Sequence, residues 1–212
     1  MPKNIFNELE DLFLKELNAG IVSGQLINFN NEITRTSSKK PSLISEFDGI
    51  GRIDHSKDPK KITEVGILRG ACLGVSKTMV EDIGGYDEDF FFYFEDTEWC
   101  VRAQNNGWKV FLNPNIEIVH IGGASSNELF RESRIEFYRS RIIFWRKIFP
   151  KPVVFLLHIW NIPKLILDLF FYSFICFITL GLNNRIKKKL IDRYTVLLWL
   201  SLGKPKNWGL PR

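Results

Sequence analysis

The chain divides into two parts of opposite charge, and this division constrains its fold more than any single motif does. Residues 1–130 carry 13 lysines and arginines against 20 acidic residues, a net charge of −7. Residues 131–212 carry 16 basic residues against 4 acidic ones, a net charge of +12. This contrast predicts two regions with different partners, of which the basic one suits nucleic acid or an anionic membrane surface.

The composition is that of a folded globular protein, because 45% of the 212 residues are hydrophobic and 25% are charged. Cys72, Cys100 and Cys176 lie far apart and form no Cys-x-x-Cys pair, which excludes a cysteine-rich zinc site. The sparse, odd cysteine count suits a reducing compartment, and the first residues lack the apolar core of a signal peptide. We therefore expect a cytoplasmic protein.

Short helical and extended patterns alternate in the acidic part, separated by a polar stretch over 30–63 that predicts a long loop. Ser76 is expected to cap a short helix, and Gly107 to end a later one. The expected helices cover 4–19, 76–82 and 96–106, and the expected strands are 21–22, 26–27, a segment of 65–75, and 109–112 and 116–120 around a turn at 113–115.

The basic part is predicted to be helical and to contact a membrane. Residues 127–149 fit a basic amphipathic helix, in which arginines alternate with aromatic and apolar residues. The apolar stretch that follows is cleanest over 165–182, which has one charge and is at the lower limit of length for crossing a bilayer. Three lysines follow at 187–189. The alternative is an ordinary helical subdomain, and no recognisable nucleic-acid-binding motif is present.

The densest group of chemically active side chains runs from Gly84 to Asp96, with the sequence Gly-Gly-Tyr-Asp-Glu-Asp-Phe-Phe-Phe-Tyr-Phe-Glu-Asp. A carboxylate against apolar surface has a raised pKa, which favours a role as a general base. The alternative is a surface turn followed by core aromatics and an acidic residue at a helix start. The pattern alone leaves both interpretations open.

Two smaller features are candidates for ligand binding. His120 ends an alternating strand next to flexible glycines, where it is placed to reach a metal or a phosphate, although a structural histidine fits the same pattern. Gly70 and Ala71 would allow a ligand to approach the backbone, although a simple packing turn also fits.

In combination and in this order, the motifs resemble the C-terminal half of a family 2 glycosyltransferase, closest to rhamnosyl- and galactofuranosyltransferases. The order is Gly-Ala, Gly-Gly-Tyr-Asp-Glu-x-Phe-Phe, Glu-Asp-x-Glu-x-x-x-Arg, Gly-Trp, Pro and His-x-x-Gly, over about residues 66–126. Similarity over 1–30 is weaker. The resemblance implies an α/β fold, part of a GT-A domain resembling a Rossmann sheet, over 1–126, and a helical extension over 127–212.

The resemblance also assigns roles to individual residues. Asp96 matches the catalytic base, which takes a proton from an acceptor hydroxyl as that oxygen attacks the anomeric carbon with inversion. Glu95 would orient the acceptor or the base, although Glu98 replaces the aspartate usual two residues after the base. His120 matches a histidine that in some relatives ligates a divalent metal, Mg²⁺ or Mn²⁺. The substrate-binding residues implied are Gly70, Ala71, Asp87, Glu88 and Arg102, of which the arginine also braces its helix.

One part of the family pattern is absent from the sequence. The nucleotide-binding half, with its Asp-x-Asp metal motif, would precede this chain, so roughly 90 residues are expected to be missing. Asp87-Glu88-Asp89 belongs to the acceptor-side motif and does not replace it. We therefore expect the metal only together with the missing half, and no sugar transfer by this chain alone.

Three interpretations of such a chain remain open. In the first, the chain is a fragment of a longer enzyme. In the second, it is half of a split enzyme with a partner chain, and in the third, it is a non-catalytic, membrane-associated scaffold. The implied partners are a nucleotide-sugar donor, a glycan or lipid-linked acceptor and the inner face of a membrane, and no nucleic acid. An exposed sheet edge favours a partner chain or a homo-oligomer. A hydrolase using Asp96 and Glu98 lacks a second set of catalytic residues.

Overall fold

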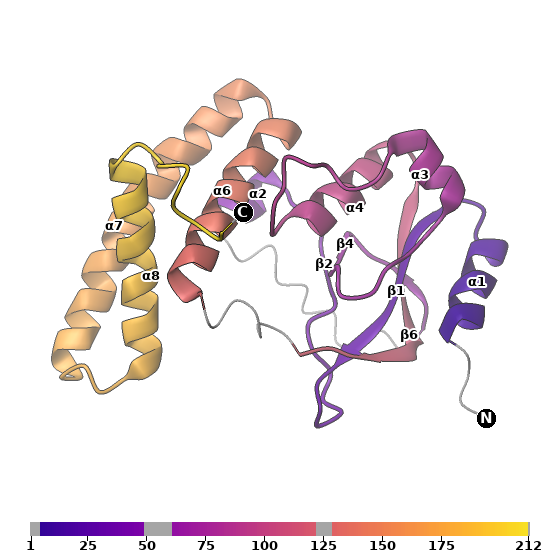
Figure 1. Ribbon diagram of the computed structural model, residues 1–212, viewed down its shortest axis with the longest axis horizontal. Helices are drawn as coiled ribbons and strands as arrows, with labels where there is room; N and C mark the ends of the chain where they lie inside the picture. The colour runs from indigo at the N-terminus through magenta and orange to yellow at the C-terminus, as the bar shows by residue number, and fades with distance from the viewer. Residues whose placement is uncertain (1–4, 49–60, 122–128, 212) are drawn as a thin grey trace. The chain divides into compact units, whose positions relative to one another are not determined.

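The structure is a computed structural model that describes residues 5–48, 61–121 and 129–211 (Figure 1). It divides into two compact units. The first consists of Met1–Asp89 and Phe94–Gly122, and the second of Phe90–Tyr93 and Gly123–Arg212. The chain is of mixed α/β type, with a mixed sheet in the first unit and helices at its C-terminal end.

A four-stranded sheet forms the centre of the first unit. Its long strands, β1 (Ala19–Ile27) and β6 (Lys109–Val119), lie side by side and run parallel. Two short edge strands, β3 (Thr63–Glu64) and β5 (Gly74–Val75), pair antiparallel with β6 and β1 respectively. A separate small sheet pairs β2 (Ser37–Ser38) with β4 (Ile67–Leu68).

Helices cover both faces of the β1–β6 pair. Figure 1 shows α1 (Ile5–Lys15) on one side and α4 (Glu95–Asn105) on the other. The apolar face of α1 packs on the sheet in a core cluster of Leu9, Leu12, Ala19, Val22, Phe111 and Ile116. On the opposite side, α4 buries Trp99, Cys100, Val101 and Ala103.

Two of the predicted helices in this unit are confirmed. The side chain of Ser76 caps α3 (Lys77–Ile83) by accepting a hydrogen bond from the Met79 N–H at 3.4 Å. Helix α4 begins one residue before the predicted start. Gly107 directly follows its cap with φ of 85°, the left-handed conformation in which glycine commonly ends a helix.

The prediction of a helix over 4–19 is confirmed for 5–15 and wrong for its last four residues. Helix α1 ends at Lys15, because the chain must turn before it enters β1 at Ala19. Leu17 lies in this turn and is 94% exposed. Gly20, the residue after the predicted helix, is part of β1.

The predicted strands are confirmed, but the breaks predicted within each pair are wrong, because each pair forms one continuous strand. Residues 21–22 and 26–27 belong to β1, and the expected turn at 113–115 is a bulge within β6. Gly24 pairs with Asn113 and Gln25 with Glu117, so the residues between Asn113 and Glu117 have no partner on β1. A bulge keeps the strand direction, whereas a turn would reverse it.

The long loop predicted over 30–63 is partly wrong. It contains β2 and the helix α2 (Leu43–Asp48), while residues 49–60 lie outside the described residues. Thr36 anchors its first part, since its hydroxyl accepts hydrogen bonds from the Gln25 side chain at 2.6 Å and from the Leu26 N–H at 2.8 Å. A buried side-chain network thus replaces the expected solvated chain.

The second unit consists of α6 (Phe130–Ile148), α7 (Lys151–Ile178) and α8 (Asn184–Ser201). The predicted helix over 127–149 is confirmed from Phe130 onward, and residues 127 and 128 lie outside the described part. Ion pairs link the helices, with Arg134 of α6 2.6 Å from Asp192 of α8. Arg193 of α8 bonds Asp168 of α7 at 2.8 Å.

Helix α7 is, among the described residues, the one long and apolar enough to cross a membrane by length and composition. Only 17% of its most apolar 18-residue stretch is buried. The apolar stretch expected over 165–182 therefore lies mostly in a helix whose surface is largely uncovered. This is weakly compatible with contact between the protein and a membrane.

Gly24 offers a test of the close β1–β6 packing. A Cβ atom at this position would lie 2.6 Å from the Ile116 carbonyl oxygen and 2.6 Å from Ile116 Cγ2. We expect Gly24→Ala to lower the free energy of unfolding by about 1–3 kcal/mol, because backbone must move to admit the methyl group.

Urea unfolding of both variants measures the effect. Gly85→Ala is the matched control, since a Cβ at Gly85 meets nothing within 4 Å. We expect that variant to change the free energy of unfolding by less than about 0.5 kcal/mol. Equal stability of the two variants would contradict the packing described here.

Candidate active site

Helix α4 begins immediately after a strained segment of backbone. Tyr93 and Phe94 have φ of 67° and 68°, so two consecutive non-glycine residues adopt the left-handed conformation. Phe94 is the N-cap, and its side chain makes no capping hydrogen bond. Glu95, Asp96 and Glu98 occupy the first turn, where the helix dipole favours negative charge. Strain of this kind is typical of functional sites.

The preceding residues, 90–93, belong to the second unit and are held there by α6. The Ser140 hydroxyl donates a hydrogen bond to the Phe92 carbonyl at 2.7 Å. The Tyr93 ring meets the Phe137 ring edge to face, with centroids 5.6 Å apart. These contacts fix the residues that lead into the left-handed turn.

Asp96 is held by three hydrogen bonds. Its Oδ2 accepts one from the Gly70 N–H at 2.8 Å, and its Oδ1 accepts two from Thr97, from the N–H at 2.6 Å and the hydroxyl at 3.1 Å. The carboxylate therefore has one fixed orientation. Oδ2 keeps acceptor capacity, because each carboxylate oxygen has about two lone-pair sites and only one of those on Oδ2 is used.

Gly70, which the sequence places 26 residues from Asp96, lies against it in the structure. A Cβ atom at Gly70 would be 3.3 Å from Asp96 Cβ and 3.6 Å from the Tyr86 hydroxyl oxygen. Gly70 and Ala71 are both exposed. The Asp96 carboxylate and the Tyr86 hydroxyl thus both lie close to the exposed Gly70.

Tyr86 is the residue of this cluster that the sequence did not predict. Its ring packs on Trp99, with centroids 4.5 Å apart, and its side chain is 46% exposed. Burial, followed by the negative charges of Asp96 and Glu95, raises the pKa of Tyr86 to about 12. It therefore stays protonated at neutral pH and can donate a hydrogen bond. Its position in the Gly-Gly-Tyr-Asp-Glu motif was the available signal.

Glu95 lies beside Asp96 with one carboxylate oxygen unpaired. Its Oε2 is buried without a hydrogen-bond partner among the described residues. Burial raises the pKa of Glu95 above 4.5, and the negative charge of Asp96 raises it further. A hydrogen bond from the backbone N–H of Glu95 lowers this pKa and so opposes the shift. A proton or a ligand donor would satisfy this oxygen.

Arg102 faces the protein and holds the turn before Tyr86. It forms a two-point ion pair with Glu98, at 2.9 and 3.0 Å, and donates to the carbonyls of Ile83 and Gly85. Trp99 adds a hydrogen bond from its indole N–H to the Gly84 carbonyl at 3.0 Å. These contacts fit a brace of the helix, while the predicted role of Arg102 in substrate binding stays a prediction.

The other predicted site residues make local contacts of their own. Asp87 accepts a hydrogen bond from the Asp89 N–H at 3.0 Å, which forms a local turn, and Glu88 is exposed. His120 directly follows β6, and its N–H donates to the Ile27 carbonyl at 2.9 Å. The described residues contain no group of three side chains suited to hold a metal ion. His120 as a metal ligand stays a prediction.

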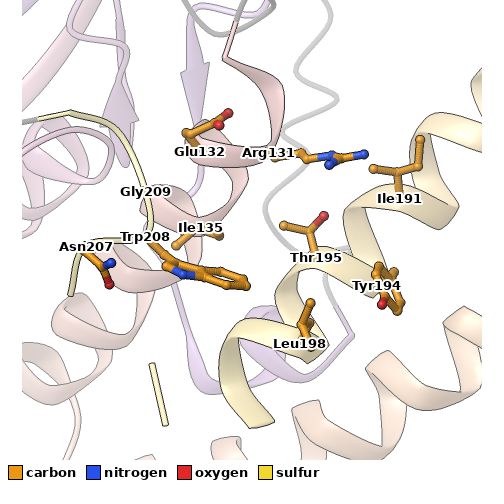
Figure 2. A pocket seen from close by; sticks show the side chains of 10 residues that line it. All are labelled: Arg131, Glu132, Ile135, Ile191, Tyr194, Thr195, Leu198, Asn207, Trp208 and Gly209. Carbon is orange, nitrogen blue, oxygen red and sulfur yellow. The ribbon is translucent and has the colours of Figure 1, made fainter. Parts of the chain in front are cut away.

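A separate cavity lies in the second unit, between α6, α8 and the C-terminal segment (Figure 2). It has a volume of about 490 Å³, and the side chains of Ile135, Leu198 and Trp208 form its apolar wall. Arg131 and Glu132 also line it. None of the predicted site residues lines this cavity, so the candidate active site is the cluster around Asp96.

Comparison with known proteins finds partial relatives, although no family model matches the chain. It is 44% identical over 52 residues to dTDP-rhamnosyl transferase RfbF of Shigella flexneri, covering 24% of this chain and 18% of that protein. It is 35% identical over 69 residues to N-acetylglucosaminyl-diphospho-decaprenol L-rhamnosyltransferase of Mycobacterium tuberculosis, covering 32% and 21%. The resemblance to glycosyltransferases is confirmed.

An archaeal relative extends the similarity further along the chain. The low-salt glycan biosynthesis hexosyltransferase Agl10 of Haloferax volcanii is 30% identical over 120 residues, covering 53% of this chain and 33% of that protein. The chain thus spans between about a fifth and a third of the length of the curated relatives it matches. These relatives are rhamnosyl- and hexosyltransferases.

The raised pKa of Glu95 predicts how stability depends on pH. As the pH rises above 4.5, the unfolded chain loses this proton before the folded protein does. The contribution of Glu95 to stability is therefore present at low pH and lost as the pH rises through its folded pKa. We expect Glu95→Gln, which has no such proton, to gain stability relative to the wild type as the pH rises.

Thermal or urea unfolding at several values between about pH 4 and 8 measures this difference. The expected sign is a variant increasingly more stable than the wild type toward neutral pH. Glu117→Gln, at an exposed position of β6, is the matched control and should follow the wild type. A Glu95→Gln profile parallel to that of the wild type would show that Glu95 titrates normally.

Proposed function

We propose that this chain is the acceptor-side part of an inverting GT-A glycosyltransferase, in which Asp96 is the catalytic base. The observation that carries the proposal is the fixed orientation of Asp96 beside Gly70 and Tyr86, within a motif that resembles this family. The relatives named above are transferases of rhamnose or hexose, which supports the class of reaction.

The proposed reaction uses the free acceptor capacity of Asp96. The carboxylate takes the proton of an acceptor hydroxyl while the hydroxyl oxygen forms a bond to the anomeric carbon of the donor sugar. The bond from that carbon to the nucleoside diphosphate breaks on the opposite side, and the anomeric centre inverts. The Gly70 N–H keeps Asp96 oriented, and the protonated Tyr86 is placed to donate a hydrogen bond to the acceptor.

The proposed donor and acceptor follow from the relatives. One is named for a dTDP-linked rhamnose and another for a diphospho-decaprenol acceptor. For this chain we propose a nucleoside-diphosphate sugar as donor and a glycan or lipid-linked acceptor. A lipid-linked acceptor fits a peripheral location at the inner face of a membrane. Gly70, Ala71, Asp87, Glu88 and Arg102 are proposed to contact or shape the substrate site.

The metal site is incomplete within the described residues. His120 would supply a single ligand, and no further group of metal-binding side chains accompanies it there. We propose that Mg²⁺ or Mn²⁺ binds only together with a donor-binding half carried by a longer polypeptide or a partner chain. When bound, the ion supplies positive charge to the leaving diphosphate. The mechanism proposed for Asp96 assigns no step to it.

The assay that tests this proposal measures sugar transfer by the protein as its source produces it, including any partner chain. Asp96→Asn should lower kcat/KM by about 10²- to 10⁴-fold, because it removes the base and keeps the shape. Asp11→Asn, the same change on the exposed surface of α1, should leave the activity unchanged.

The possible results separate the proposals. Unchanged transfer in Asp96→Asn would contradict the assignment of the base. Robust transfer by the 212-residue chain alone, lost in Asp96→Asn, would contradict the proposed need for a donor-binding half. No transfer in any assembly would favour the alternative proposal, a non-catalytic membrane-associated scaffold or partner subunit. The largely uncovered surface of α7 is the observation that favours this second function.

A further inference from the structure

The α7–α8 hairpin exposes a large apolar surface. Large apolar side chains on α7 remain more than half exposed along much of its length, such as Phe155, Leu167, Phe170 and Phe177. A soluble monomer rarely leaves so large a contiguous apolar surface in water, and such a surface commonly marks a contact with protein or membrane.

The tip of this hairpin is the most exposed apolar part. Leu180 and Leu182 are 83% and 82% exposed, in the turn between α7 and α8. The turn is tightly built, since the Gly181 N–H donates to the Cys176 carbonyl at 2.8 Å and Leu180 adopts a left-handed φ of 47°. The backbone thus holds two leucine side chains outward, and exposing these apolar side chains to water is unfavourable.

A basic pocket adjoins this tip. It has a volume of about 230 Å³ and lies between the start of α6 and the first turns of α8. Arg134 is held in place by its ion pair with Asp192, at 2.6 and 3.2 Å, and the Lys188 ammonium lies 4.6 Å from the centre of the Phe130 ring. The pocket is lined by Phe130, Arg134, Arg185, Lys188, Lys189 and Asp192.

The charge of this pocket suits a phosphate group. Four basic side chains face one acidic side chain, and the surrounding segment 131–212 has a net charge of +12. Arginine and lysine are the usual partners of phosphate oxygens, and basic pockets beside membrane-facing helices bind phospholipid headgroups. The turn that carries the apolar tip leads directly into α8, whose first turns line the pocket. Apolar contacts to lipid and ionic contacts to phosphate are therefore available close together.

Charges beside α7 favour an interfacial position for the hairpin over a transmembrane one. Helix α8 packs antiparallel along α7 (Figure 1), and Arg193 of α8 bonds both Asp168 of α7 and Asp192. If α7 crossed the hydrocarbon core, this charged network would have to enter it as well, at a high cost. At the interface, the apolar surface meets lipid while the basic side chains stay at the headgroups.

We propose that the basic pocket binds the phosphate of an anionic phospholipid while the exposed apolar surface of α7 lies in the lipid interface. The location at a membrane rests on the proposed function, but the binding site and its ligand do not involve Asp96. The experiment below contains no measurement of sugar transfer, so the two proposals succeed or fail separately.

Flotation of the whole chain with vesicles tests the pocket. We expect the protein to bind phosphatidylcholine vesicles that contain phosphatidylglycerol much more strongly than pure phosphatidylcholine vesicles. Arg185→Glu combined with Lys189→Glu should weaken binding to the anionic vesicles by at least about thirtyfold. Both residues are exposed, so the variant should fold, which circular dichroism checks.

The matched control is Lys61→Glu combined with Lys206→Glu, two exposed positions outside the pocket with the same change in net charge. We expect it to retain most of the binding. An equal loss in both variants would show a diffuse charge effect and would overturn the pocket. Binding of inorganic phosphate by a chain that does not bind anionic vesicles would assign the pocket to free phosphate and overturn the lipid.

A second variant tests the apolar surface. Phe174→Asp combined with Phe177→Asp should weaken binding to anionic vesicles without changing the pocket, because both side chains are exposed on α7. Unchanged binding would overturn the interfacial position of the helix. If the wild-type chain binds no vesicles and light scattering shows a dimer, the apolar surface belongs to a second copy of the chain and the proposal is overturned.

Discussion

The ion pair between Arg102 and Glu98 is the interaction on which the candidate active site depends. The Glu98 side chain is 5% exposed and that of Arg102 is 23% exposed, so loss of either partner would leave a charge with little water to solvate it. The same guanidinium holds the carbonyls of Ile83 and Gly85. One side chain thus joins the helix that carries Asp96 to the turn that carries Tyr86.

Local signals in the sequence predicted the parts of the fold that depend on neighbouring residues. Ser76 caps its helix through a hydrogen bond to Met79, three residues away, and the first turn of α4 is stabilised by its own acidic residues. Such interactions are visible in a short window of sequence.

The strands could not be predicted in the same way, because their partners are distant in the chain. Residues 113–115 have the composition of a turn, and only the pairing of β6 with β1, about 90 positions earlier, makes them a bulge. Likewise, Thr36 orders a polar segment through Gln25, whose amide carries no signal of that contact in the sequence.

In the candidate site too, local motifs could be predicted and contacts between distant residues could not. Gly70 and Asp96 were predicted separately from motifs, and the structure brings them into hydrogen-bond contact. Tyr86 was missed, since a tyrosine in an acidic, aromatic segment looks like a packing residue until its hydroxyl is found beside Gly70. His120 directly follows β6, and the described residues contain no group of three side chains suited to hold a metal ion beside it.

The four residues 90–93 have a consequence for the evolution and dissection of this protein. The chain leaves the sheet-containing unit at Phe90, joins the helical unit for four residues and returns at Phe94. Within the helical unit, Phe92 and Tyr93 contact α6. No single cut or crossover point along the chain therefore separates the two units, because residues 90–93 of the second unit lie between two segments of the first.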